Sequence, residues 1–273
     1  MPQLDQGRAW NLATTMITAN KDVIGIVAGV FFFLPNVAAA FLMPQSGELA
    51  ALSGSQNPDP AALWAQLTAF YADVWWVFLL MGVAQAVGVL GLLALLTDHR
   101  RPTVGEALLF GIKALIPYLV TQLLVSFAIA LVIMVLVAIG AVINVAVAVA
   151  MAALGMIVAA YIWTKFALVA PVMAIEGVLN PLAALKRSWS LTKGNSVRLF
   201  TFFLLLVLVL LVVSMITGLV FSMFGLLGAE IAVIVSALGG GLLNMAFVVV
   251  MLAVLAAVHQ QLSGGTKVGE TFE

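Results

Sequence analysis

Six long apolar segments constrain this chain more than any other feature. They cover about residues 23–43, 74–97, 114–137, 145–171, 199–223 and 231–258. A helix needs about 20 apolar residues to cross about 30 Å of hydrocarbon. Lipid offers no hydrogen bonds to an exposed backbone, so such segments cross as helices. The sequence therefore predicts an all-α integral membrane protein with six transmembrane helices. We expect a single domain over residues 1–262 and a polar tail over 263–273.

Composition supports this class and argues against several functions. The chain is 64% hydrophobic and 8% charged, whereas soluble domains carry about 25% charged residues. Eleven basic and eleven acidic residues cancel, so no net charge attracts nucleic acid. There is no cysteine and there are two histidines, which argues against a metal site. We find no phosphate loop, nucleophile elbow or carboxylate pair. We therefore expect no enzyme, no cofactor and no metal.

The placement of basic residues predicts the topology. Six crossings put all eleven Lys and Arg residues on one side of the membrane. The charged residues in the loops of the other side are all acidic, namely Glu48, Asp59, Asp73 and Glu230. By the positive-inside rule, both termini and the segment between spans four and five are cytoplasmic. Asp5 and Asp22 interrupt the start of the chain, so we expect the first span to be an uncleaved anchor.

A weak internal repeat groups the spans in pairs. A short amphipathic segment precedes two spans three times, starting near Gly7, Thr103 and Pro181. Arg8 and Trp10 have the spacing of Arg187 and Trp189. The pattern predicts three helical hairpins, each preceded by a short cytoplasmic interfacial helix. The alternative, that any protein with several spans alternates in this way, remains open.

Prolines and small residues predict how the spans bend and pack. Pro35 lies inside the first span and predicts a kink, whose freed carbonyl needs a new partner. Small residues in spans two and six predict close helix contacts; they are Gly82, Ala84, Gly88, Gly91, Ser236, Gly240 and Asn244.

Aromatic residues accumulate before the second span, after a helix start at Asp59-Pro60. They are Trp64, Phe70, Tyr71, Trp75 and Trp76. Such a cluster is typical of an aromatic belt at the boundary of water and lipid. A carbohydrate-binding platform is the alternative.

Residues 171–194 form the only long segment that is neither lipid-like nor a short turn. Asn180-Pro181 predicts a helix start and Gly194 its end. Leu182, Leu185 and Trp189 share a face of this helix, and Arg187 projects from the other side. We expect a membrane-surface helix that binds lipid headgroups through Lys186, Arg187, Trp189 and Lys193. The alternative is that the basic residues only anchor the topology.

Polar residues within the spans are the second set of candidates, because such groups are costly in lipid. Lys165 lies about two turns inside span four. Two interpretations are open: its ammonium group pairs with the carboxylate of Glu176, or it extends to the membrane surface. Gln85, Gln122 and Asn36 either join helices by hydrogen bonds or line a polar path.

The central segment resembles a bacterial family of six-span membrane proteins. The resemblance rests on Pro171, Glu176, Pro181 and the run from Ala184 to Gly194, ALKRSWSLTKG. This family includes the membrane region of some glycerophosphodiester phosphodiesterases and the uncharacterised YciC-like proteins. The resemblance implies a membrane module over residues 5–262 in the bacterial inner membrane. It implies no catalytic residue, because the catalytic part of those phosphodiesterases needs a soluble barrel.

Three functions agree with these observations. The first is a non-enzymatic inner-membrane protein that binds or organises phospholipids, aiding lipid movement or membrane homeostasis. The second is an accessory subunit whose grooves receive a span of a partner membrane protein or of a second copy. The third is a secondary transporter of a small solute that uses Lys165 and Glu176. The absence of carboxylates near the middle of any span argues against the third.

Overall fold

The computed structural model describes residues 3–42, 60–97 and 103–264, and this part of the chain is helical without strands. Its elements are α1 (Gln6–Ala19), α2 (Lys21–Ala28), a π-helix η1 (Gly29–Phe33), α3 (Leu34–Leu42), α5 (Pro60–Thr97), α6 (Val104–Ile143), α7 (Val145–Phe166), α8 (Val169–Ile175), α9 (Pro181–Thr192), α10 (Ser196–Ser222), a 3-10 helix η2 (Met223–Leu227) and α11 (Ala229–Leu262). Six stretches are long and apolar enough to cross a membrane. The predicted class, an all-α protein with six such helices, is confirmed.

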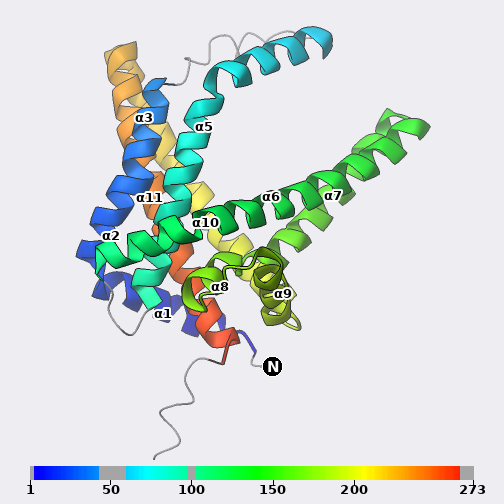
Figure 1. Cartoon of the computed structure of the whole chain (residues 1–273). Coiled ribbons are helices and arrows are strands. Elements are labelled where there is room, and N and C mark those ends of the chain that lie inside the picture. The colour runs from blue at the N-terminus through cyan, green and yellow to red at the C-terminus, as the bar shows by residue number, and fades with distance from the viewer. Residues whose placement is uncertain (1–2, 43–59, 98–102, 265–273) are drawn as a thin grey trace, which may run out of the picture.

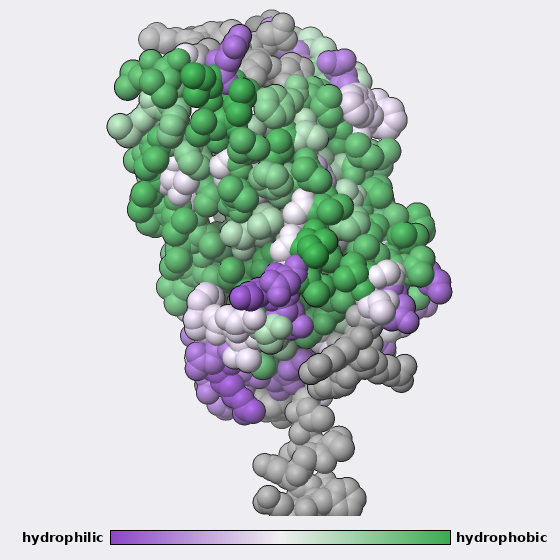
Figure 2. All heavy atoms as spheres, turned by 90° about the vertical axis from the view of Figure 1, so that its left-hand side faces the viewer, coloured by the Kyte–Doolittle hydropathy of each residue, from purple (hydrophilic) through white to green (hydrophobic). Residues whose placement is uncertain are grey.

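Helices α1, α8 and α9 gather at one end of the molecule, which also holds the start of α10 and the end of α11 (Figure 1). We call this the terminal end. The backbone N–H of Asp5 donates to Oε1 of Gln261 at 3.1 Å, and Leu4 donates to Oδ1 of Asn195 at 3.0 Å. These bonds hold the start of the chain against α11 and α10. Above this end, Figure 2 shows a broad apolar surface on the face it presents.

Helix α1 covers the terminal end instead of standing apart from the bundle. Asp5 accepts a hydrogen bond from the N–H of Arg8, which caps the helix. Ala9, Ala13 and Met16 are buried against the bundle, while Trp10 is exposed. The amphipathic segment predicted to start near Gly7 is therefore a helix with one side on the protein and one side open.

The first span contains a widened, π-helical turn just before Pro35. Proline has no N–H and clashes with the preceding turn, and a π-helical turn accommodates that defect. Nδ2 of Asn244 on α11 donates to the carbonyl of Phe32 in this turn, at 3.5 Å. This bond ties α11 to the turn, but the carbonyl that Pro35 leaves without a helical donor is that of Phe31, four residues earlier, so the predicted partner of the freed carbonyl stays a prediction.

Glycines allow some helices to approach closely. A Cβ on Gly88 would lie 2.6 Å from Cβ of Phe31, and one on Gly111 would lie 2.8 Å from the carbonyl of Val87. Close packing is confirmed for Gly88 and also holds for Gly91, but Gly82 has open space around it. On α11 the prediction chose the wrong glycine. Gly240 faces open space, whereas the close contacts are made by its neighbours Gly239 and Gly241.

Helices α6 and α7 form an antiparallel pair joined at Asn144, whose Oδ1 accepts from the N–H of Val147. The expected short helix before span three is absent, because α6 runs without a break from Val104. Thr103 and Glu106 form a capping box at its start. Forty residues make about 60 Å of helix, twice the thickness of hydrocarbon. The pair therefore leaves the bundle obliquely (Figure 1). The prediction of three equivalent hairpins stays a prediction.

Helix α5 begins at Pro60, as predicted, while Asp59 lies outside the described residues. The helix continues without a break through the aromatic cluster into span two. Trp64, Tyr71, Trp75 and Trp76 are exposed on its outer half, which is where a belt at the lipid boundary has to lie.

Span four is broken near the terminal end. Helix α7 stops at Phe166, and α8 starts at Val169 and contains Pro171. The missing N–H of Pro171 removes a donor for the carbonyl four residues earlier, which favours a break there. Helix α8 then turns into the bundle, where Val172 and Met173 are fully buried. This break positions the candidate site, because it separates Lys165 from Glu176.

Candidate functional site

Helix α9 has the boundaries that the sequence predicts. Oδ1 of Asn180 accepts from the N–H of Ala183 at 3.1 Å, Pro181 is the first helical residue, and Gly194 adopts a φ of +82° after the end. One face of α9, with Ala184, Ser188 and Leu191, is buried in the bundle. The other face is open.

The buried face of α9 supplies donors to the broken end of α7. Oγ of Ser188 donates to the backbone carbonyl of Lys165 at 2.9 Å, and Oγ1 of Thr192 lies 3.5 Å from the same oxygen. Both hydroxyl side chains are fully buried. A helix that ends inside a protein needs such partners for its last carbonyls. The break in span four therefore fixes the position of α9.

The side chain of Lys165 lies among aromatic rings. Its Nζ is 5.0 Å from the ring centre of Trp189 and 5.5 Å from that of Tyr161, distances at which a cation is attracted to a ring. Lys165 is 4% exposed and makes no ion pair within the described residues. Both predicted alternatives are wrong: Lys165 neither pairs with Glu176 nor extends to the surface. Helix α9 covers it, and the turn after Phe166 carries Glu176 away.

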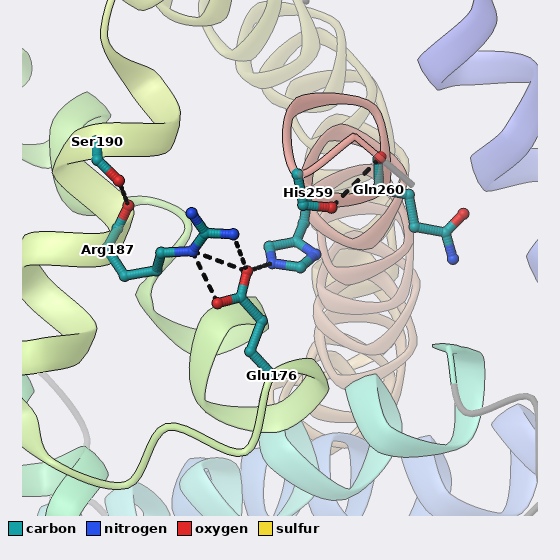
Figure 3. Close-up of polar contacts among 6 residues, drawn as sticks. Glu176, Arg187, Ser190, His259 and Gln260 are labelled. Carbon is teal, nitrogen blue, oxygen red and sulfur yellow. Dashed lines mark hydrogen bonds and ion pairs between the residues drawn. The ribbon is translucent and has the colours of Figure 1, made fainter. Parts of the chain in front are cut away.

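Glu176 instead brings the end of α8 together with α9 and with the end of α11, which lies 83 residues further along the chain (Figure 3). Nε of Arg187 lies 2.8 Å from Oε2 and Nη2 lies 2.9 Å from Oε1, so the guanidinium binds the carboxylate with two donors. Nε2 of His259 on α11 lies 3.0 Å from Oε1. We call these three residues the carboxylate cluster. It links the end of α8, the outer part of α9 and the end of α11.

Electrostatics favour the ionised form of this carboxyl group. Partial burial works to raise the pKa of Glu176, but the hydrogen bonds and charge of Arg187, together with the bond from His259, outweigh it, so the pKa lies below its ordinary value. The same carboxylate raises the pKa of Arg187. Two-donor contacts between arginine and carboxylate are strong and directional. The cluster therefore holds α9 against the end of α8.

The cluster offers little for chemistry. The hydroxyl of Ser190 donates to the carbonyl of Arg187, within its own helix. His259 is 2% exposed, and its Nδ1 has no hydrogen-bond partner. In the described part of the chain, no three His, Asp or Glu residues form a group that could hold a metal ion. Sequence reasoning missed His259, although an ionisable residue at the end of a span was a usable signal.

Two of the four predicted headgroup residues, Lys186 and Trp189, lie on the open face of α9, and a third, Lys193, directly follows the end of the helix. Lys186, Trp189 and Lys193 are exposed, and Leu182 continues the same stripe one turn earlier. Arg187 is committed to Glu176 instead. The open face and the residue that follows α9 thus combine two ammonium groups with two apolar side chains.

The predicted amides within the spans are spread over three helices, and no hydrogen bond joins any two of them. Asn36 on α3 and Gln85 on α5 are half-buried. Nε2 of Gln122 on α6 donates to the hydroxyl of Tyr118 at 2.9 Å. These two residues line a mainly apolar cavity of about 230 Å³, together with Trp163. These three amides therefore form no continuous path with one another.

The chain has no match in three comparisons with known proteins. No model of a protein family matches it, and neither a curated protein nor a solved structure does.

Proposed function

We propose that this protein is a non-enzymatic membrane protein that binds phospholipids with the open face of α9. The observation that carries the proposal is the stripe of Leu182, Lys186, Trp189 and Lys193, which is exposed on a helix at the terminal end. Apolar side chains beside ammonium groups fit the boundary between acyl chains and phosphates. Each basic residue near an anionic membrane surface contributes about 1 kcal/mol to binding.

The proposal gives the carboxylate cluster a supporting role. Arg187 holds α9 to α8 and α11 through Glu176 and His259. The position of Lys186 relative to the bundle is therefore fixed. We further propose that the terminal end faces the cytoplasm of a bacterium, because the described basic residues lie on helices at or near this end.

The first test is native mass spectrometry of the purified protein in a mild detergent, with the retained lipids identified. We expect wild-type protein to retain phospholipid and a Lys186→Ala, Lys193→Ala double variant to retain less. The matched control is Lys113→Ala, since Lys113 is exposed on α6. Wild-type protein without bound phospholipid, or a double variant that retains as much as wild type, contradicts the proposal.

One observation favours a role as an accessory subunit as the second candidate. The tip of the pair α6 and α7 exposes Val142, Ile143 and Val145. Such an arm suits contact with a partner's span. In that case a second protein chain, in constant ratio, accompanies the purified protein. For the third candidate, a transporter, we find no supporting observation, since rings and α9 cover Lys165.

A further inference from the structure

A cavity of about 230 Å³ lies beside the break in span four. Phe166 at the end of α7, Ala167 in the break and Ala170 on α8 form one part of its wall. Val89 on α5 and Met251 on α11 belong to the rest. All the residues that line the cavity belong to candidate spans, and none belongs to α9 or to the carboxylate cluster. The cavity is therefore a site of its own within the spans.

Gln122 and Trp163 connect the cavity to the outer surface of the spans. Both side chains line it, and both are exposed. Side chains on this surface contact lipid when the spans are in a membrane. A polar side chain such as that of Gln122 is costly there unless its hydrogen-bonding groups are used. A molecule dissolved in the membrane thus reaches the cavity at these two side chains.

The wall of the cavity favours a neutral ring compound. Tyr118, Trp163, Phe166 and Phe247 contribute aromatic rings to it, and aromatic rings pack favourably against one another when offset or edge to face. No described residue that lines the cavity is charged. Because a charge without a partner is costly in such surroundings, a phosphate or another ionised group does not suit this site.

Tyr118 gives the cavity a hydrogen-bond donor that the protein leaves unused. The side chain is buried, and its hydroxyl oxygen accepts from Nε2 of Gln122 at 2.9 Å. Among the described residues, no acceptor takes the hydrogen of this hydroxyl group, and no donor bonds to Oε1 of Gln122. A buried donor without an acceptor destabilises a protein. The site therefore favours a ligand with a carbonyl oxygen over a hydrocarbon of the same shape.

The volume of the cavity limits the ligand to about one ring. A dry apolar cavity of about 150 Å³ holds one benzene molecule, so 230 Å³ accommodates one ring with a few substituents. Any longer tail has to leave the cavity at Gln122 and Trp163. An intact phospholipid, with its headgroup and two acyl chains, is far too large.

We propose that this cavity binds a neutral, membrane-soluble ring compound, with its ring among Tyr118, Trp163 and Phe166 and a carbonyl oxygen at the hydroxyl of Tyr118. Aromatic ketones and quinones have this chemistry. The inference goes beyond the proposed function and does not depend on it, because α9 and its lysines take no part in the site.

The test is fluorine NMR of the full chain in detergent, with two probes of the same shape. The first probe, para-fluoroacetophenone, carries a ketone oxygen, and the second, para-fluoro-α-methylstyrene, carries a CH₂ group in its place. Detergent micelles without protein give the signal of the unbound probe. We expect both probes to bind the protein saturably, and the ketone to bind about fivefold more tightly, which is the effect of one ordinary hydrogen bond.

Two variants separate the hydrogen bond from the shape of the cavity. Tyr118→Phe keeps the ring and removes the donor, so it should lower the affinity for the ketone about fivefold and leave that for the hydrocarbon unchanged. Tyr161→Phe is its matched control, since Tyr161 does not line this cavity, and should change neither affinity. Ala167→Phe places a ring in the cavity and should weaken the binding of both probes. Its control is Ala130→Phe, at an exposed position of α6.

Several results would overturn the inference. Equal affinity of the wild-type protein for the two probes, or a preference for the ketone that survives Tyr118→Phe, would show that Tyr118 does not recognise a carbonyl group. No saturable binding of either probe, or binding that survives Ala167→Phe, would show that ring compounds do not occupy this cavity. Displacement of both probes by added phospholipid would assign the cavity to an acyl chain. None of these results depends on Lys186 or Lys193, so the proposed function of α9 stands or fails separately.

Discussion

Arg187 and Glu176 are joined by two donors from one guanidinium to one carboxylate, and the two residues come from helices on either side of a turn at Gly177. Gly177 adopts a φ of +68°, which suits glycine after a helix end. The turn reverses the chain so that α9 lies back against α8. The position of α9, and with it the open face that we assign to lipid, depends on this contact.

Replacing Arg187 should therefore loosen α9. Arg187→Ala leaves Glu176 with His259 as its partner, and we expect a loss of about 1–2 kcal/mol in the free energy of unfolding, less than for a fully buried pair because solvent screens this one. Arg187→Lys should recover only part of the lost free energy of unfolding, since lysine lacks the planar guanidinium group that binds a carboxylate with two donors. Thermal unfolding in detergent measures the effect. Lys186→Ala is the control, and an equal loss there would contradict the assignment.

The carboxylate cluster also predicts a dependence on pH. The pKa of Glu176 is lowered in the folded protein, so its ionised form stabilises the fold above the ordinary value of 4.5. This contribution is lost as the pH falls through the lowered pKa. Glu176→Gln should therefore be less stable than wild type at neutral pH, and the difference should shrink below about pH 4.

The measurement is the difference in unfolding temperature between wild type and Glu176→Gln across the pH range. Taking the difference removes the titration of the other carboxyl groups, which both proteins share. A gap that stays constant into strong acid, or that grows there, would show that the charge of Glu176 does not stabilise the fold.

The hydroxyl of Ser188 should contribute more to the free energy of unfolding than the hydroxyl of Ser190. Ser188→Ala removes the 2.9 Å donor to the buried carbonyl of Lys165, for which we expect a cost of about 1–3 kcal/mol. Ser190 donates within its own helix, so Ser190→Ala should change little. Unfolding temperatures of the two variants decide the matter. Equal effects would mean that α9 is not held by this bond.

The sequence was sufficient for the spans and for α9, because both depend on local signals. Apolar runs of membrane length and the start at Asn180-Pro181 need no knowledge of distant contacts. The partners of Glu176 could not be predicted in the same way. His259 is 83 residues further along the chain, and its place beside Glu176 depends on the break in span four. Pro171 signals that break, but not the direction that α8 then takes.

The crossing of α5 and α6 gives the last prediction. A Cβ on Gly111 would lie 2.8 Å from the backbone carbonyl of Val87, and a backbone atom cannot rotate away as a side chain can. Gly111→Ala should therefore separate the helices, at a cost of about 1–3 kcal/mol. Gly82→Ala is the matched control on α5, where nothing lies within 4 Å of the new Cβ. There the better helix propensity of alanine should leave stability unchanged or raise it slightly. Thermal unfolding of both variants tests the crossing, and a harmless Gly111→Ala would show that α5 and α6 do not pack this closely.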